Sequence, residues 1–385
     1  MLQLELNKEI FKKIKSDWLD KDKIVIDNLS GGYPETEYYY RGRYTIIIKP
    51  EKLTEVCPQI REMYPKENMT LKIFMEGVIG PKQLSHLERI TQMVQIQNIY
   101  SINGLAPHIY NFVKVNNLYA QITDFIKGEY CYSRAHQIHN TVHQLALDNY
   151  INCSCDVYPS NIIDNQWVDF DGFNFDNFNK YKAGVIEKYK KDTFFGNSNG
   201  PYQPFKELGI EGLRDDSRKE LFNLDSYDFE GKTVLDIGCS GGYFVNYCAA
   251  RGARAIGIEA KEKIDTIFEA SNIAGFFGAE YYSAQLVHDD LPEFLYRVTG
   301  LRKFDYVFFL SVDAHIGFKD YLKDITKGTL FFESNGAKLE DEEREIFSKK
   351  LNSMFPSVEH LGYSREGTIR NLFVCKQEVF NDSIK

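Results

Sequence analysis

Long apolar runs are absent from this sequence of 385 residues. A membrane-spanning helix needs about 18 or more consecutive apolar residues, so we expect no part of the chain to cross a membrane. Basic residues are fewer than acidic ones: the sequence has 46 lysines and arginines against 55 aspartates and glutamates, which gives a net charge of −9. Since a large nucleic-acid footprint needs clustered lysine and arginine, this balance argues against a nucleic-acid partner and leaves room only for a local basic patch.

Paired cysteines are missing as well. The sequence has seven cysteines, an odd number, and shows no secretory leader, so we expect free thiols in a reducing cytoplasm. Cys153 and Cys155 have no matching Cys/His pair at zinc-ligand spacing, and we interpret them as structural. Internal repeats and low-complexity tracts are also absent. The length suffices for two domains, and the turn-rich stretch 196–201 predicts a linker between domains 1–195 and 202–385.

The clearest signal in the sequence is an apolar strand followed by a glycine-rich turn. The run 234–237 is typical of a buried parallel strand, and Gly238, Gly241 and Gly242 allow a tight turn and the close approach of a ligand. A helix is expected over 243–251, and Gly252 is the glycine expected after its end. A second strand then ends in Glu259, whose carboxylate suits ribose hydroxyls. The pattern therefore predicts a nucleotide-cofactor site.

This turn lacks the glycines of the dinucleotide fingerprint, because Ser240 and Tyr243 occupy their positions. Asp236 adds a carboxylate at the strand end, which would repel a pyrophosphate but suits a cofactor that carries an ammonium and a sulfonium group. The run resembles motif I of class I S-adenosylmethionine (SAM) methyltransferases, and Glu259 resembles their ribose-binding acid. The resemblance implies that SAM is bound by Asp236, Gly238, Ser240, Gly242 and Glu259.

The rest of the C-terminal half fits that resemblance. Apolar runs at 304–312 and 328–333 read as further strands, and strands that alternate with helical stretches predict an α/β, doubly wound, Rossmann-like sheet. Upstream, the leader that begins with Tyr202 and Gln203 contains Arg214. In similar leaders of small-molecule and glycan methyltransferases an arginine can meet the SAM carboxylate; a solvated helix arginine is the alternative.

Candidate residues for the methyl transfer lie near the ends of the later strands. The run 304–311 resembles the fourth strand of the family, whose end faces the reacting methyl group, so Asp313 and His315 are candidate bases, with Glu333 at the end of the next strand. His315 packed over the cofactor is the alternative. The stretch 311–315 departs from the Asn-Pro-Pro-Tyr type of motif of amino-methylating enzymes, which favours an oxygen nucleophile. Arg370 is a candidate for meeting an anionic substrate or, alternatively, a strand-edge residue.

The first two hundred residues carry motifs that are individually weak, so their order along the chain is the informative feature. Lys72 lies in a predicted strand, Glu88 in the following helix 83–100, and a Gly-Leu-Ala-Pro stretch, Asp156, Asn161 and an Asp-Phe-Asp run at Asp169 come later. This order resembles the protein-kinase fold, and most closely the aminoglycoside- and choline-phosphotransferase branch. The resemblance implies an α+β domain that binds ATP and Mg²⁺. Lys72 would hold the phosphates and pair with Glu88, Asp156 would accept the substrate proton, and Asn161 and Asp169 would hold magnesium.

Three features depart from the kinase pattern. Ser154 stands where a histidine is usual, the spacing from Asn161 to Asp169 is short, and little chain follows Asp169 before the predicted linker. A reduced or inactive kinase-like domain, or an α+β substrate-binding domain with chance motif matches, is therefore the alternative.

Two functional hypotheses follow from these features. The first is a SAM-dependent methyltransferase that O-methylates a small molecule or glycan, with a phosphate group as one candidate, coupled to a kinase-like domain that phosphorylates or binds the acceptor. It resembles the bifunctional kinase–methyltransferases of glycan biosynthesis. The second is a methyltransferase whose N-terminal module is non-catalytic and recognises a macromolecule such as tRNA. The acceptor, the general base and the oligomeric state are left open by the sequence.

Overall fold

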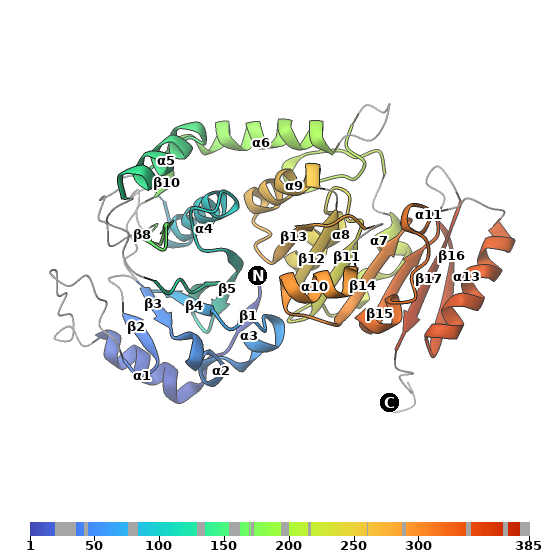
Figure 1. Ribbon diagram of the computed structural model, residues 1–385, viewed down its shortest axis with the longest axis horizontal. Helices are drawn as coiled ribbons and strands as arrows, with labels where there is room; N and C mark the ends of the chain where they lie inside the picture. Colours follow the sequence, from blue (N-terminus) through green and yellow to red (C-terminus); the bar gives the residue numbers. More distant parts are fainter. Residues whose placement is uncertain are drawn as a thin grey trace. The chain divides into compact units, whose positions relative to one another are not determined.

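The computed structural model describes residues 1–19, 36–41, 45–75, 84–128, 135–153, 162–168, 170, 173–193, 200–214, 217–259, 261–286, 290–335, 340–364 and 369–377. The chain divides into two compact units, residues 1–185 (unit 1) and 186–385 (unit 2). The division falls inside helix α6 (Phe178–Asp192), as Figure 1 labels it, and most of the linker predicted at 196–201 lies outside the described residues. Within those residues, no helix has both the length and the apolar character that crossing a bilayer requires.

Unit 1 is built on a six-stranded sheet with the order β1-β5-β6-β4-β3-β2 (Figure 1). The strands are β1 (Gln3–Leu4), β2 (Tyr39–Arg41), β3 (Thr45–Ile48), β4 (Met69–Phe74), β5 (Ile109–Val115) and β6 (Leu118–Asp124). Only β1 pairs in parallel, with β5; the other pairs are antiparallel. Because side chains alternate along a strand, Leu71 and Ile73 of β4 face an apolar cluster while Lys72 points to the opposite face.

Helices enclose the apolar cluster of unit 1. That cluster joins one face of the sheet to α1 (Lys8–Leu19), α2 (Leu53–Val56) and α3 (Pro58–Met63), with the 3-10 helix η2 (Pro50–Lys52) before α2. A second group is aromatic: Tyr100 of α4 (His86–Ile102) packs on Phe170 and Phe173 at ring distances of 5.4 and 5.9 Å. The remaining elements are α5 (Ala135–Asp148) and the short strand pairs β7 (Ile151–Asn152) with β10 (Asn174–Phe175) and β8 (Ile162–Ile163) with β9 (Gln166–Trp167).

Unit 2 is built on a seven-stranded sheet with the order β13-β12-β11-β14-β15-β17-β16. The strands are β11 (Thr233–Ile237), β12 (Arg254–Glu259), β13 (Ala279–Ser283), β14 (Phe304–Leu310), β15 (Thr326–Glu333), β16 (Ser357–Ser364) and β17 (Arg370–Lys376). The first five strands are parallel, and β17 lies antiparallel between β15 and β16. The strand order reverses between β11 and β14, and such a switch point opens a ligand crevice at the carboxyl ends of the strands.

Helices cover both faces of this sheet. On one face, α10 (Leu291–Thr299), α12 (Leu322–Ile325) and α13 (Glu340–Met354) join an apolar cluster with alternate strand residues. On the other face, Phe244 of α8 (Tyr243–Ala250) stacks on Phe308 at 5.1 Å, and Phe308 stacks on Phe331 at 4.7 Å. The remaining elements are η4 (Lys206–Leu208), α7 (Ser217–Leu221), η5 (Leu224–Ser226), α9 (Lys261–Ala274) and α11 (Asp313–Ile316). The predicted fold class, a Rossmann-like sheet preceded by an α+β domain, is confirmed.

Candidate functional site

The glycine-rich turn connects the end of β11 to the start of α8. Gly238 and Gly242 have φ angles of +74° and +81°, which favour glycine. Neither position has room for a side chain, because a Cβ atom would lie 2.8 Å from Val312 Cγ2 at Gly238 and 2.5 Å from Tyr281 Oη at Gly242. Ser240 has a φ of +51°, which is uncommon for a residue with a Cβ atom. The surrounding contacts therefore hold the turn in one shape, which only glycine permits at Gly238 and Gly242.

Glu259 ends β12 beside this turn. Because β11 and β12 run parallel, their carboxyl ends meet at the same edge of the sheet. Glu259 Oε2 accepts a hydrogen bond from the backbone N–H of Ser240 at 2.8 Å. The structure thus brings the predicted ribose-binding acid directly against the predicted cofactor turn.

Asp236 lies in β11 with its carboxyl group buried, the residue being 2% exposed. Its Oδ2 makes no hydrogen bond with any residue that the structure describes. Burial raises the pKa of Asp236 to about 7; the positive charge of Arg218 opposes this shift and Glu259 adds to it. A buried carboxyl oxygen without a donor is costly, so this position fits a cationic or hydrogen-bond-donating group of a ligand.

A group of buried charges lies at the ends of β14 and β15. Glu333 is fully buried, and its Oε2 lies 3.4 Å from Arg218 Nη1 and 3.6 Å from Arg370 Nη1. Ser311 Oγ donates to the same oxygen at 2.5 Å and accepts a hydrogen bond from Arg370 Nη1. Two guanidinium groups therefore share one carboxylate, whose Oε1 has no hydrogen-bond partner among the described residues.

Arg214 adds a third cation to this group. Its guanidinium lies 4.8 Å from the centroid of the Tyr202 ring. Burial lowers the pKa of Arg214, Tyr202 opposes that effect, and the charges of Arg218 and Arg370 lower the pKa further, as expected of neighbouring cations. Since Arg214 is buried, the alternative of a solvated helix arginine is wrong. Glu333 thus has three arginines near it, while Asp236 interacts with Arg218 and Asp313 with Arg370. Guanidinium groups are well suited to bind the oxygens of an anionic ligand.

The two candidate bases differ in their surroundings. Asp313 begins α11, and burial raises its pKa to about 6, with a further contribution from the charge of Glu343. Its Oδ1 has no hydrogen-bond partner among the described residues. His315 is exposed, and no described residue orients its ring, although a general base is usually held by a third group. The surroundings therefore favour Asp313 over His315 as a proton acceptor.

Two residues that hold the glycine-rich turn were missed in the sequence. Tyr189 of α6 is fully buried, and its Oη donates to the Gly241 carbonyl oxygen at 2.8 Å. A Cβ atom at Gly241 would clash with that Oη. Gln203 Oε1 accepts a hydrogen bond from the backbone N–H of Tyr243 at 3.1 Å. No sequence pattern marks Tyr189, which stands in a lysine-rich helix, whereas Gln203 stands in the leader that the resemblance includes.

The predicted ion pair between Lys72 and Glu88 is not formed among the described residues. Glu88 is the third residue of α4, and its Oε2 accepts a hydrogen bond from the backbone N–H of Ser85 at 2.7 Å, while Ser85 Oγ accepts one from Glu88 N. This reciprocal capping box satisfies the start of the helix and lowers the pKa of Glu88. The Glu88 carboxylate is therefore hydrogen-bonded to the start of its own helix rather than paired with Lys72.

Lys72 itself is buried on the face of the unit 1 sheet opposite the apolar cluster. Its Nζ lies 5.9 Å from the centroid of the Phe74 ring, and it pairs across the strands with Gln121. Gln121 Nε2 donates to Gln97 Oε1 of α4 at 3.1 Å. The α4 residue that reaches this polar face is therefore a glutamine in the middle of the helix rather than the glutamate at its start.

The other kinase-like candidates, Asp156, Asn161 and Asp169, lie outside the described residues, as does Ser154. Within the described ranges, no three histidine, cysteine, aspartate or glutamate side chains come together as metal ligands. The assignments of a proton acceptor and of magnesium ligands in unit 1 therefore stay predictions.

Comparisons with known proteins give similarities to solved structures only. No protein-family model matches the chain, and no curated protein matches it. Among solved structures, the bifunctional kinase-methyltransferase WbdD is 19% identical with a TM-score of 0.39, over 52% of this chain and 47% of that one. The chain thus spans about half the length of WbdD.

Smaller methyltransferases match over nearly their whole length. A SAM-dependent methyltransferase from Aquifex aeolicus is 18% identical with a TM-score of 0.33, over 43% of this chain and 95% of that one. Magnesium protoporphyrin IX methyltransferase from Synechocystis PCC 6803, with bound SAH, is 14% identical with a TM-score of 0.32, over 52% of this chain and 96% of that one.

Proposed function

We propose that unit 2 is a SAM-dependent methyltransferase that methylates an anionic oxygen, such as a phosphate oxygen, of a small-molecule or glycan acceptor. One observation carries the proposal: acids and arginines gather at the carboxyl edge of the same sheet, beside a glycine-rich turn. The acids are Asp236, which is buried, and Glu259, which is partly exposed; the arginines are Arg214 and Arg218, which are buried, and Arg370, which is partly exposed.

The residues around the turn fit SAM group by group. Asp236 Oδ2 has no partner among the described residues and suits the ammonium group. Glu259 suits the ribose hydroxyls, Arg214 suits the carboxylate, and Gly238 and Gly242 give the turn between Asp236 and α8 its tight shape. When bound, SAM supplies the electrophilic methyl group. The chain contributes alignment of the reactants and exclusion of water.

The arginines support an anionic acceptor. Arg370 and Arg218 converge on Glu333 at the ends of adjacent strands, where their positive charge favours an acceptor that arrives deprotonated. Such an oxygen needs no general base, which agrees with the exposed position of His315. Asp313, with a pKa of about 6, is the residue we expect to take the proton if the acceptor is a neutral hydroxyl.

We also propose that unit 1 phosphorylates or binds the acceptor. The buried cation of Lys72 on a polar sheet face supports this role, and the kinase resemblance names ATP and Mg²⁺ as its ligands. A non-catalytic module that recognises a macromolecule such as tRNA is the alternative. ATP binding in the presence of Mg²⁺ discriminates the two, because the alternative predicts none and predicts that Lys72→Ala leaves activity unchanged.

The first experiment is a calorimetric titration of the full chain with SAM, followed by transfer of a labelled methyl group to phosphorylated and unphosphorylated sugars. Asp236→Asn is expected to weaken SAM binding, because it removes the charge that suits an ammonium group. Asp228→Asn, an exposed aspartate of the same unit, is the matched control and should leave binding unchanged. Absence of SAM binding by the wild-type chain would overturn the proposal.

A further inference from the structure

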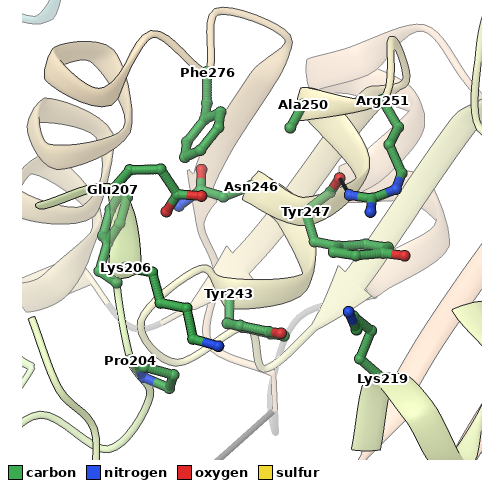
Figure 2. Close-up of a pocket in the computed structure, with 11 residues that line it drawn as sticks. Pro204, Lys206, Glu207, Lys219, Tyr243, Asn246, Tyr247, Ala250, Arg251 and Phe276 are labelled. Carbon is green, nitrogen blue, oxygen red and sulfur yellow. Dashed lines mark hydrogen bonds between the residues drawn. The ribbon is translucent and has the colours of Figure 1, made fainter. Parts of the chain in front are cut away.

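A cavity of about 260 Å³ on the outer face of α8 has no part in the proposed methyl transfer. Tyr243, Asn246, Tyr247 and Arg251 recur along this face at helical spacing, and Figure 2 displays them together. Phe244 and Cys248, by contrast, are buried toward the sheet. The other walls come from the segment 204–207, from Lys219 of α7 and from Phe276. The cavity therefore lies on the side of α8 that faces away from the strands.

Asn246 supplies a fixed hydrogen-bond donor in this cavity. The residue is only 5% exposed, and its Oδ1 accepts a hydrogen bond from Tyr281 Oη at 2.9 Å. That bond sets the orientation of the amide, and no described residue accepts a hydrogen bond from Nδ2. Because Asn246 lines the cavity, its amide can donate a hydrogen bond to an oxygen or nitrogen of a ligand.

Cations surround the same cavity. Lys206, Lys219 and Arg251 line it, against one acid, Glu207. Lys219 and Arg251 share the exposed carboxylate of Asp225, at 3.4 and 2.9 Å, so three cations face two acids even when that neighbour is counted. In a chain of net charge −9, this is a local positive excess that favours a phosphate group.

Aromatic rings complete the lining. Tyr243 lies between Lys206 and Lys219 in Figure 2, and Phe276 is held by stacking on Phe205 at 5.9 Å with an interplanar angle of 18°. Aromatic faces bind the faces of nucleobases and other rings. We propose that this cavity is a second ligand site, which binds a ring-bearing phosphate ester with its ring against the aromatic side chains, a ring acceptor atom on Asn246 Nδ2 and its phosphate on Lys206 and Lys219.

The site also touches the support of the glycine-rich turn. Tyr281, which donates to Asn246, is the side chain that a Cβ atom at Gly242 would meet at 2.5 Å. Tyr243, which lines the cavity, directly follows Gly242. A ligand on Asn246 therefore acts close to the turn, through a side chain that packs against it.

The test uses the full chain and three probes: glucose 6-phosphate, adenosine monophosphate and inorganic phosphate, each titrated by calorimetry. We expect one of the two esters to bind at least about tenfold more tightly than inorganic phosphate, since the ring adds contacts. Lys206→Gln should weaken that binding by about tenfold, the cost of one charge-assisted hydrogen bond. Lys303→Gln makes the same charge change at an exposed lysine of the same unit outside the cavity and should leave binding unchanged.

Preference for glucose 6-phosphate identifies a sugar phosphate as the source of the ligand, and preference for adenosine monophosphate identifies a nucleotide. If neither ester binds, or if both lysine variants weaken binding equally, the proposal is overturned. SAM titrations of both variants run in parallel. Lys206 lines the cavity and is not part of the glycine-rich turn. Failure of ester binding can therefore be distinguished from failure of SAM binding.

Discussion

The contact between Tyr189 and Gly241 predicts how the glycine-rich turn responds to substitution. In Gly241→Ala, the new Cβ atom would overlap Tyr189 Oη, whereas its next neighbours, Gln203 Oε1 and Tyr189 Cζ, lie at 3.5 Å, an ordinary contact distance. The clash therefore comes from one hydroxyl group. Overpacking of this kind costs about 1–3 kcal/mol, so we expect SAM affinity to fall by roughly 5- to 150-fold as the turn moves.

Tyr189→Phe removes that hydroxyl and with it the hydrogen bond to the Gly241 carbonyl oxygen. Loss of one such bond costs about 0.5–1.5 kcal/mol, which weakens SAM binding by roughly 2- to 12-fold. In the double variant the new Cβ atom at position 241 has room, so its affinity should equal that of Tyr189→Phe alone. The two substitutions are thus expected to be non-additive by about the full cost of the clash.

The assay is a calorimetric titration with SAM, with thermal unfolding of the same four proteins as a second readout. Gly184→Ala is the matched control, because Gly184 lies in helix α6 with nothing within 4 Å of an added Cβ atom; it should leave SAM affinity unchanged. The reasoning is refuted if Gly241→Ala weakens SAM binding equally in the wild-type and Tyr189→Phe backgrounds. Thermal unfolding reports the same coupling even if SAM does not bind.

Three further predictions concern the buried charges and the helix cap. Burial raises the pKa of Asp236 from 3.8 to about 7, so between these pH values the folded state holds a proton that the unfolded state releases. The free energy of unfolding should therefore fall as pH rises from about 4 to 7. Asp236→Asn should abolish this contribution to the pH dependence of the free energy of unfolding, measured by urea titration at several pH values. Glu333→Gln leaves Arg218 and Arg370 without their carboxylate and should destabilise unit 2 by about 3–5 kcal/mol. Added phosphate should raise the melting temperature of this variant more than that of the wild type. An equal rise in the two proteins would contradict an anion site at the arginines. Glu88→Ala should lower the melting temperature of unit 1 by a few degrees through loss of the capping box and should leave ATP binding unaltered. A loss of ATP affinity equal to that of Lys72→Ala would instead support an ion pair between Lys72 and Glu88.

Much of the geometry of the proposed cofactor site was predictable, because that site is encoded by residues close together in the chain. The apolar run before Gly238, the glycines of the turn and Glu259 after the next strand are local signals, and parallel pairing of β11 with β12 brings their ends together. The kinase-like ion pair was wrong for a related reason. Glu88 has a local partner in Ser85, three residues away, which satisfies its carboxylate before any long-range contact is needed.

The sequence by itself determined the Rossmann-like class of unit 2 and the turn that SAM would occupy, since periodicity and glycine placement follow from backbone geometry. Only the tertiary structure decided which charges meet around that turn. Arg218 and Glu333 are separated by 115 positions, and Tyr189 reaches Gly241 from 52 positions away. Such contacts depend on the order of the strands and on where helices pack, which no spacing in the chain reveals. The same holds for the cavity behind α8, whose walls come from four separate segments.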